Sequence, residues 1–157
     1  MIEWTLKDGE RLDDLVRDGM RLIQRPDQFC FSVDSVLLAH YVKPKAKDRI
    51  ADLGTGTGVI SLLVSALGGR DITAFEVNPV MADLARRNIA GNGKEDQIHV
   101  VECDYRKVNE RFPSGSFSLV LANPPYRDIG TGKMSVLEGV ASASYEMNAS
   151  LTDVFKT

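Results

Sequence analysis

From residue 49 to residue 122 the sequence alternates between short apolar runs typical of strands and longer runs typical of helices. Glycine or proline turns separate the runs, and a proline opens the second helical run. The predicted strands are Arg49–Leu53, Ile72–Val77, Ile98–Val101 and Phe117–Ala122, and the predicted helices are Val59–Leu67 and Val80–Ala90. Because strands and helices that alternate over short connections build parallel sheets, this pattern predicts an α/β fold with helices on both faces of a mostly parallel sheet.

The first 48 residues lack this alternation, and we expect them to form an N-terminal segment of the same structural domain as residues 49–157. We predict a helix or turn from residue 11, a strand at Leu22–Gln24, a second short strand through Phe29, Phe31 and Val33, and a helix over Ser35–Val42. Ser32 or Asp34 is the expected cap of that helix.

Composition limits the classes of function. The 157 residues carry 19 Lys and Arg against 22 Asp and Glu, a formal net charge of −3, which excludes a strongly basic nucleic-acid coat protein. Two distant cysteines indicate buried thiols in a reducing compartment. The longest apolar run is too short to span a membrane, and the start is too charged for a signal peptide. We therefore expect a cytoplasmic protein without membrane attachment, and no residue cluster indicates a metal site.

The glycine-rich turn Asp52-Leu-Gly54-Thr55-Gly56-Thr-Gly58 follows the first predicted strand of the sheet and precedes a helix. Glycines at this place let the backbone turn sharply and approach a ligand, so the turn predicts a nucleotide-type pocket. Val59 stands where a dinucleotide fingerprint has its third glycine, which disfavours an NAD-dependent oxidoreductase. Asp52 can accept a hydrogen bond from an amine, and S-adenosylmethionine has both an amine and a sulfonium.

Two further acids end the next two strands. Glu76 lies where a carboxylate can accept hydrogen bonds from both hydroxyls of a ribose. Asp104 lies where a carboxylate can accept a hydrogen bond from an adenine amine. Both are candidate cofactor ligands.

Asn123-Pro124-Pro125-Tyr126 directly follows the fourth strand and is the most specific motif of the chain. The side-chain oxygen of Asn123 and the carbonyl of Pro124 can hold the two hydrogens of an amine whose lone pair is delocalised, which helps its nitrogen to attack a methyl group. Consecutive prolines stiffen the loop, and Tyr126 offers a flat surface for stacking. These four residues are the predicted catalytic group.

Together these motifs resemble class I S-adenosylmethionine-dependent methyltransferases of the amino-methylating branch. More narrowly, Glu10-Arg-Leu-Asp13, Ile23-Gln24, Phe31-Ser-Val-Asp-Ser-Val-Leu-Leu38 and Tyr145-Glu146 resemble the bacterial tRNA adenine-N6 methyltransferases, which modify the adenine beside the anticodon of a valine tRNA. The resemblance implies a Rossmann-like fold, a tRNA partner, and S-adenosylhomocysteine as product.

The same resemblance implies roles for individual residues. Asp52 and the glycine turn (Gly54, Thr55, Gly56 and Gly58) would hold the methionine part of the cofactor, and Phe31 and Ser32 would cover it. Glu76 would bind ribose, Asp104 the cofactor adenine, and Asn123 to Tyr126 the target base, with Asn123 also among the residues that contact the cofactor. An unpaired anticodon-loop adenine leaves its stack more easily than a paired one.

The sequence departs from the family pattern at two places. Ser144 replaces a basic residue, and the chain stops at Thr157 where the family fold has further C-terminal strands. We expect from this length a truncated chain, or one whose incomplete sheet pairs with a second copy. The alternatives are methyl transfer to a protein glutamine or to adenine in ribosomal RNA or DNA, and an inactive remnant that only binds the cofactor.

Overall fold

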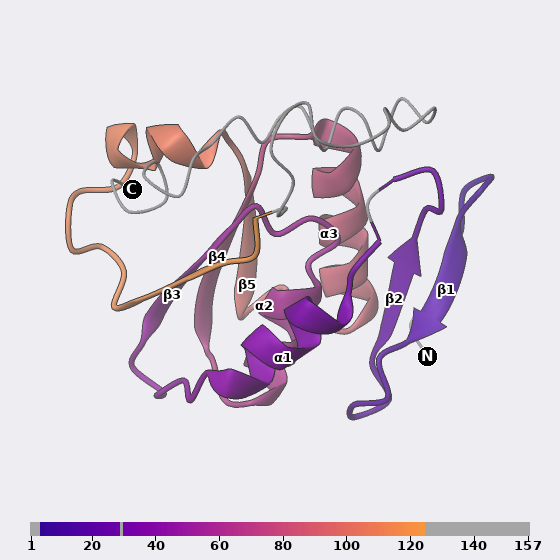
Figure 1. Ribbon diagram of the computed structural model, residues 1–157, viewed down its shortest axis with the longest axis horizontal. Helices are drawn as coiled ribbons and strands as arrows, with labels where there is room; N and C mark the ends of the chain where they lie inside the picture. The colour runs from indigo at the N-terminus through magenta and orange to yellow at the C-terminus, as the bar shows by residue number, and fades with distance from the viewer. Residues whose placement is uncertain (1–3, 29, 125–157) are drawn as a thin grey trace.

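The computed structural model describes residues 4–28 and 30–124. Its centre is a four-stranded parallel sheet in the order β5-β4-β3-β6. Figure 1 shows this sheet beside three helices, with a separate two-stranded antiparallel sheet on the far side of α3. The elements in chain order are β1 (Arg11–Asp14), β2 (Arg21–Gln24), α1 (Val33–Tyr41), β3 (Arg49–Leu53), α2 (Val59–Ala66), β4 (Asp71–Glu76), α3 (Pro79–Gly91), β5 (Ile98–Glu102), the 3-10 helix η1 (Tyr105–Glu110) and β6 (Leu119–Ala122).

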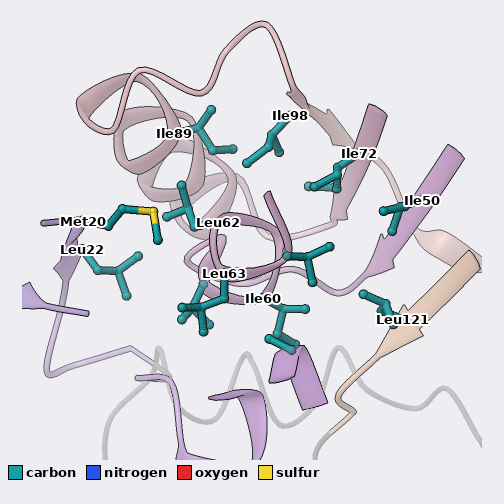
Figure 2. Close-up of a cluster of buried hydrophobic side chains, with 14 residues drawn as sticks. Met20, Leu22, Ile50, Ile60, Leu62, Leu63, Ile72, Ile89, Ile98 and Leu121 are labelled. Carbon is teal, nitrogen blue, oxygen red and sulfur yellow. The ribbon is translucent and has the colours of Figure 1, made fainter. Parts of the chain in front are cut away.

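Side chains alternate between the two faces of the central sheet, and each face has its own apolar cluster. On one face Ile50, Ile72 and Leu121 pack against Leu62 and other residues from the helices, as Figure 2 shows. All three α-helices of the described residues contribute side chains to this cluster, among them Ala39 of α1, Leu62 of α2 and Ile89 of α3. Burying each large aliphatic side chain there contributes roughly 1.5–3 kcal/mol to folding.

The opposite face is covered by η1 and by the segment that follows it. Phe75 is fully buried there and meets the rings of Phe112 and Phe117 edge-on, at centroid distances of 5.5 and 5.9 Å. The α/β class and the parallel sheet are confirmed. Both faces are covered as predicted, but in the described residues the α-helices lie on one face and the 3-10 helix η1 packs against the other.

The N-terminal predictions were partly wrong. Residues 11–14 form a strand instead of a helix or turn, because Arg11 to Asp14 pair antiparallel with Gln24 to Arg21. The strand expected through Phe31 and Val33 does not exist in the described residues, and Phe29 lies outside them. The backbone N–H of Phe31 donates to Oε1 of Gln24 at 3.0 Å, and Val33 begins α1 with Ser32 as its N-cap residue. The backbone of Phe31 is thus held by the side chain of Gln24 and not by pairing with another strand.

Two asparagines attach the hairpin β1–β2 to α3. The side-chain amide of Asn88 accepts from the backbone N–H of Ile23 at 2.6 Å and donates to the backbone carbonyl of Ile23 at 3.0 Å. The side-chain amide of Asn92 likewise accepts from the N–H of Arg21 at 3.0 Å and donates to the carbonyl of Arg21 at 2.7 Å. Asn88 and Asn92 are four residues apart, which is about 6 Å along a helix, and Arg21 and Ile23 are two residues apart, which is about 6.8 Å along a strand. The two asparagines are therefore spaced like the two peptide groups that they bind. The side-chain amides thus take the place of a neighbouring strand along the edge of β2.

Candidate active site

The carboxyl ends of all four parallel strands meet at one edge of the sheet (Figure 1). Leu53 pairs in register with Ala122 on one side and with Phe75 on the other. The glycine turn that follows Leu53 therefore begins beside Asn123. Asn123, which follows β6, and the glycine turn, which follows β3, therefore lie at the same edge of the sheet. Pro125, Tyr126, Tyr145 and Glu146 lie outside the described residues.

The glycine turn depends on backbone conformations that other residues rarely adopt. Gly54, Gly56 and Gly58 have φ of +70°, +60° and +86°, in the left-handed region. A side chain at Gly58 would also contact the Cβ of Ala85 at 3.5 Å, since the turn packs against α3. Gly58 is the N-cap residue of α2. These glycines keep the turn tight and directly precede a helix N-terminus.

Asp52 lies beneath this turn and is only 1% exposed. Its Oδ2 accepts from the hydroxyls of Thr55 at 2.6 Å and Ser61 at 2.7 Å, which joins the start of the turn to α2. Its Oδ1 is buried and has no hydrogen-bond partner among the described residues. Burial raises the pKa of Asp52 above its ordinary value, and the two hydroxyl donors oppose that rise.

Glu76, which ends β4, braces the same turn from the side. One carboxylate oxygen accepts from the N–H of Gly56 at 2.8 Å, and the other accepts from the N–H of Asn78 at 2.9 Å. Asn78 in turn caps α3 by accepting from the N–H of Val80. Glu76 is 8% exposed. Its carboxylate therefore fixes the turn relative to α3 at the edge where we expect a ribose.

Asp104 is engaged by a neighbouring cation. Both of its carboxylate oxygens contact the guanidinium of Arg106, with Nε at 2.9 Å from each, and Oδ1 also accepts from the Arg106 N–H at 3.0 Å. These hydrogen bonds lower the pKa of Asp104. The carboxylate is ionised at neutral pH, and an adenine amine that binds there would share it with Arg106.

The N-terminal segment reaches the site through the first turn of α1. Nδ2 of Asn123 donates to Oγ of Ser35 at 2.9 Å, and Ser35 is 4% exposed. The Ser35 N–H donates to the carbonyl of Ser32, and Phe31 packs against the main apolar cluster. Phe31 and Ser32 therefore lie in the segment that leads into the helix contacting Asn123.

The sequence patterns indicate no role for Ser35, Ser61 or Asn88. Asn88 is fully buried, and besides binding Ile23 it donates to the carbonyl of Thr57 in the glycine turn at 2.9 Å. A polar residue at an apolar helix position is the only signal that marks Asn88 in the sequence. For Ser35, the partner lies 88 residues away, and no local pattern indicates it.

The described residues contain no group of three or more His, Cys, Asp or Glu that could hold a metal ion. In the same residues, no helix has the length and apolar character needed to cross a membrane.

Comparison with solved structures defines the class of fold. A human methyltransferase 10 domain containing protein superposes with a TM-score of 0.59 at 22% identity, covering 69% of this chain and 55% of that one. The Pyrococcus abyssi tRNA (uracil-54, C5)-methyltransferase, solved with S-adenosyl-L-homocysteine, gives 0.58 at 22% identity over 76% of this chain and 29% of that one. The fold is the Rossmann-like fold of class I methyltransferases.

Residues 20–149 match the methyltransferase small domain family, and the chain belongs to that family. It is 33% identical over 114 residues to a tRNA1(Val) (adenine(37)-N6)-methyltransferase of Shewanella amazonensis, covering 73% of this chain and 48% of that protein. It is 32% identical over 111 residues to a putative protein N5-glutamine methyltransferase of Methanocaldococcus jannaschii, covering 69% of this chain and 52% of that protein. The chain spans about half the length of these relatives. The predicted enzyme class, a methyltransferase that uses S-adenosylmethionine, agrees with the family and the fold.

Proposed function

We propose that this protein transfers the methyl group of S-adenosylmethionine to the exocyclic amine of an adenine in tRNA. The observation that carries the proposal is the parallel register of β3 and β6, which puts Asn123 beside the start of the glycine turn at one edge of the sheet. The relatives named for tRNA adenine methylation support the choice of substrate.

The residues at this edge fit the cofactor. The buried Oδ1 of Asp52 is an acceptor that lacks a donor within the described residues, and the cofactor's methionine part carries an ammonium donor. The glycine turn (Gly54, Thr55, Gly56 and Gly58) would hold that part, with Phe31 and Ser32 covering it. Glu76 would accept from the ribose hydroxyls, and Asp104 from the adenine amine. When bound, the cofactor supplies a methyl carbon made electrophilic by its positively charged sulfur.

The chain's own residues act on the amine. Oδ1 of Asn123 and the carbonyl oxygen of Pro124 would each accept one of its hydrogens, which draws the nitrogen out of conjugation and directs its lone pair toward the methyl carbon. Pro125, as a proline, would restrict the loop, and Tyr126 would stack on the base. No strong base is required, because the nitrogen loses its proton only after it has become cationic.

A second candidate acceptor is the side-chain amide of a protein glutamine. The relative from Methanocaldococcus jannaschii supports it, and an amide nitrogen presents the same conjugated pair of hydrogens to Asn123. An adenine in ribosomal RNA or DNA would present the same exocyclic amine as an adenine in tRNA.

A labelled-cofactor assay separates these acceptors. The chain would be incubated with radiolabelled S-adenosylmethionine in four parallel reactions. Each reaction would contain one acceptor: unmodified tRNA, ribosomal RNA, DNA or a glutamine-containing protein fraction. Label in the tRNA, located to an adenine by nuclease digestion, is the expected result. Label only in protein would favour the glutamine alternative. Binding of S-adenosylhomocysteine without label in any acceptor would identify a cofactor-binding remnant.

Two substitutions separate the two halves of the site. Asn123→Ala should reduce methyl transfer by at least about 100-fold while leaving the affinity for S-adenosylhomocysteine nearly unchanged. Glu76→Ala should do the reverse and weaken cofactor binding first, as measured by calorimetry. Equal loss of both properties in Asn123→Ala would contradict the role given to the loop.

A further inference from the structure

The carboxamide of Asn123 has two chemically different ends, and only one suits the proposed reaction. Its oxygen accepts hydrogen bonds, whereas its nitrogen only donates. An amine about to be methylated presents its hydrogens, so a donor facing it would repel it. Whatever fixes the rotation of this amide therefore decides whether Asn123 can act.

Ser35 contacts the nitrogen end of the Asn123 carboxamide. Its Oγ accepts from Nδ2 of Asn123 at 2.9 Å, and the side chain of Ser35 is buried at 4% exposure. Since Ser35 lies in α1 and Asn123 directly follows β6, the contact joins the N-terminal segment to the end of the sheet.

Comparison with a second buried serine shows that this contact is not the ordinary behaviour of serine in a helix. A helical serine commonly returns its hydroxyl to a carbonyl one turn earlier. Ser65 of α2, also 4% exposed, does so by donating to the carbonyl of Leu62 at 2.7 Å. The hydroxyl of Ser35 instead meets a side chain 88 residues away, and the N-cap position of its helix belongs to Ser32.

We propose that Ser35 is a positioning residue: its hydroxyl holds the nitrogen end of the Asn123 carboxamide against α1, so that the oxygen end faces the amine of the methyl acceptor. This inference rests on the proposed function. It applies to any amine or amide acceptor, because each presents hydrogens to the same oxygen.

The test compares Ser35→Ala with Ser35→Thr, which keeps the hydroxyl, and with Ser65→Ala as a control of equal burial outside the site. Methyl transfer would be followed with the acceptor that the assay above identifies. We expect kcat to fall about 3- to 10-fold in Ser35→Ala, the effect of one lost hydrogen bond, with the dissociation constant of S-adenosylhomocysteine unchanged. Ser35→Thr should recover most of the loss, and Ser65→Ala should keep the wild-type kcat.

A second readout does not depend on activity. The side-chain NH₂ signals of Asn123, assigned by their disappearance in Asn123→Ala, should shift in the NMR spectrum of Ser35→Ala and remain near their wild-type positions in Ser65→Ala. A loss of kcat shared equally by Ser65→Ala would point to general loosening of the helices and overturn the inference.

The remaining outcomes separate this inference from the proposed function. An active wild-type chain whose kcat and Asn123 signals are unaffected by Ser35→Ala contradicts the role of Ser35 alone. A wild-type chain that binds S-adenosylhomocysteine but methylates no acceptor contradicts the proposed function, and the role of Ser35 with it.

Discussion

Two regions of the molecule are held together by hydrogen bonds from polar side chains, but the two regions use different chemical groups. At the cofactor edge, the carboxylates of Asp52 and Glu76 hold the glycine turn. At the hairpin, the carboxamides of Asn88 and Asn92 hold the edge of β2. The regions meet at the carbonyl of Thr57, to which Asn88 donates.

The difference lies in what each group can accept, donate and titrate. A carboxylate only accepts, so it gathers N–H and O–H groups and keeps further lone pairs for a ligand. A carboxamide donates and accepts, so it can pair with a peptide group as another strand would, and it does not titrate. The cofactor edge is therefore sensitive to pH and suited to a ligand, whereas the hairpin attachment is self-contained.

The largest effect should come from the hairpin side. Asn88→Ala removes three hydrogen bonds in a fully buried place and leaves the backbone of Ile23 and Thr57 without partners, so we expect a loss of about 3 kcal/mol in the free energy of unfolding. Urea denaturation measures it. Asn88→Asp keeps the shape of the side chain, but its carboxylate cannot donate to the carbonyls of Ile23 and Thr57, so this variant should lose at least as much stability as Asn88→Ala. A loss under about 1 kcal/mol would mean that apolar packing alone holds the hairpin.

The next effect distinguishes the two chemistries by pH. Burial raises the pKa of Asp52 above 3.8, so its contribution to stability is present below that pH and is lost as pH rises through the folded-state pKa. The stability of wild type relative to Asp52→Asn should therefore fall as pH rises from about 4 to 7. The stability difference between wild type and Asn88→Ala should stay constant over the same range. A difference for Asp52→Asn that stays constant with pH would show that the cofactor edge is no more sensitive to pH than the hairpin attachment.

A smaller loss, about 1 kcal/mol, is expected for Asn92→Ala. Asn92 also pairs with a peptide group of β2, but it is half-buried, so water can replace its hydrogen bonds to Arg21. Urea denaturation beside Asn88→Ala tests the ranking. Equal losses in the two variants would show that burial does not set the strength of these amide pairs.

The smallest effect should come from a charged contact on the hairpin side. Lys7 contacts Asp83 of α3 at 2.7 Å, with side-chain exposures of 59% and 46%. Lys7→Ala should cost less than about 0.5 kcal/mol, and the cost should disappear in 1 M salt. A larger loss that persists in salt would show that the stem of Lys7, and not its charge, stabilises the segment.

The core of the fold was predictable because its signals are local. Strands β3 to β6 and helices α2 and α3 match the predicted ranges to within about two residues, since strand runs, the proline at the start of α3 and the glycines after it specify each element independently of its neighbours. The 3-10 helix η1 between β5 and β6 was not predicted. In the N-terminal hairpin, the strand predicted at Leu22–Gln24 is confirmed as β2, but β1 was not predictable in the same way. Residues 11–14 carry no clear strand pattern and become a strand only through pairing with residues 21–24.

The sequence by itself determined the parallel sheet, the glycine turn, and the acids and the Asn-Pro loop that end its strands, because chain order and local pattern place these groups at the carboxyl edge of any such sheet. Only the tertiary structure decided that Ser35 holds Asn123 and that Asn88 joins the hairpin to the turn. The physical reason is that a hydrogen bond depends on a few tenths of an ångström between groups that packing brings together, and for Ser35 and Asn88 those groups are distant in the chain.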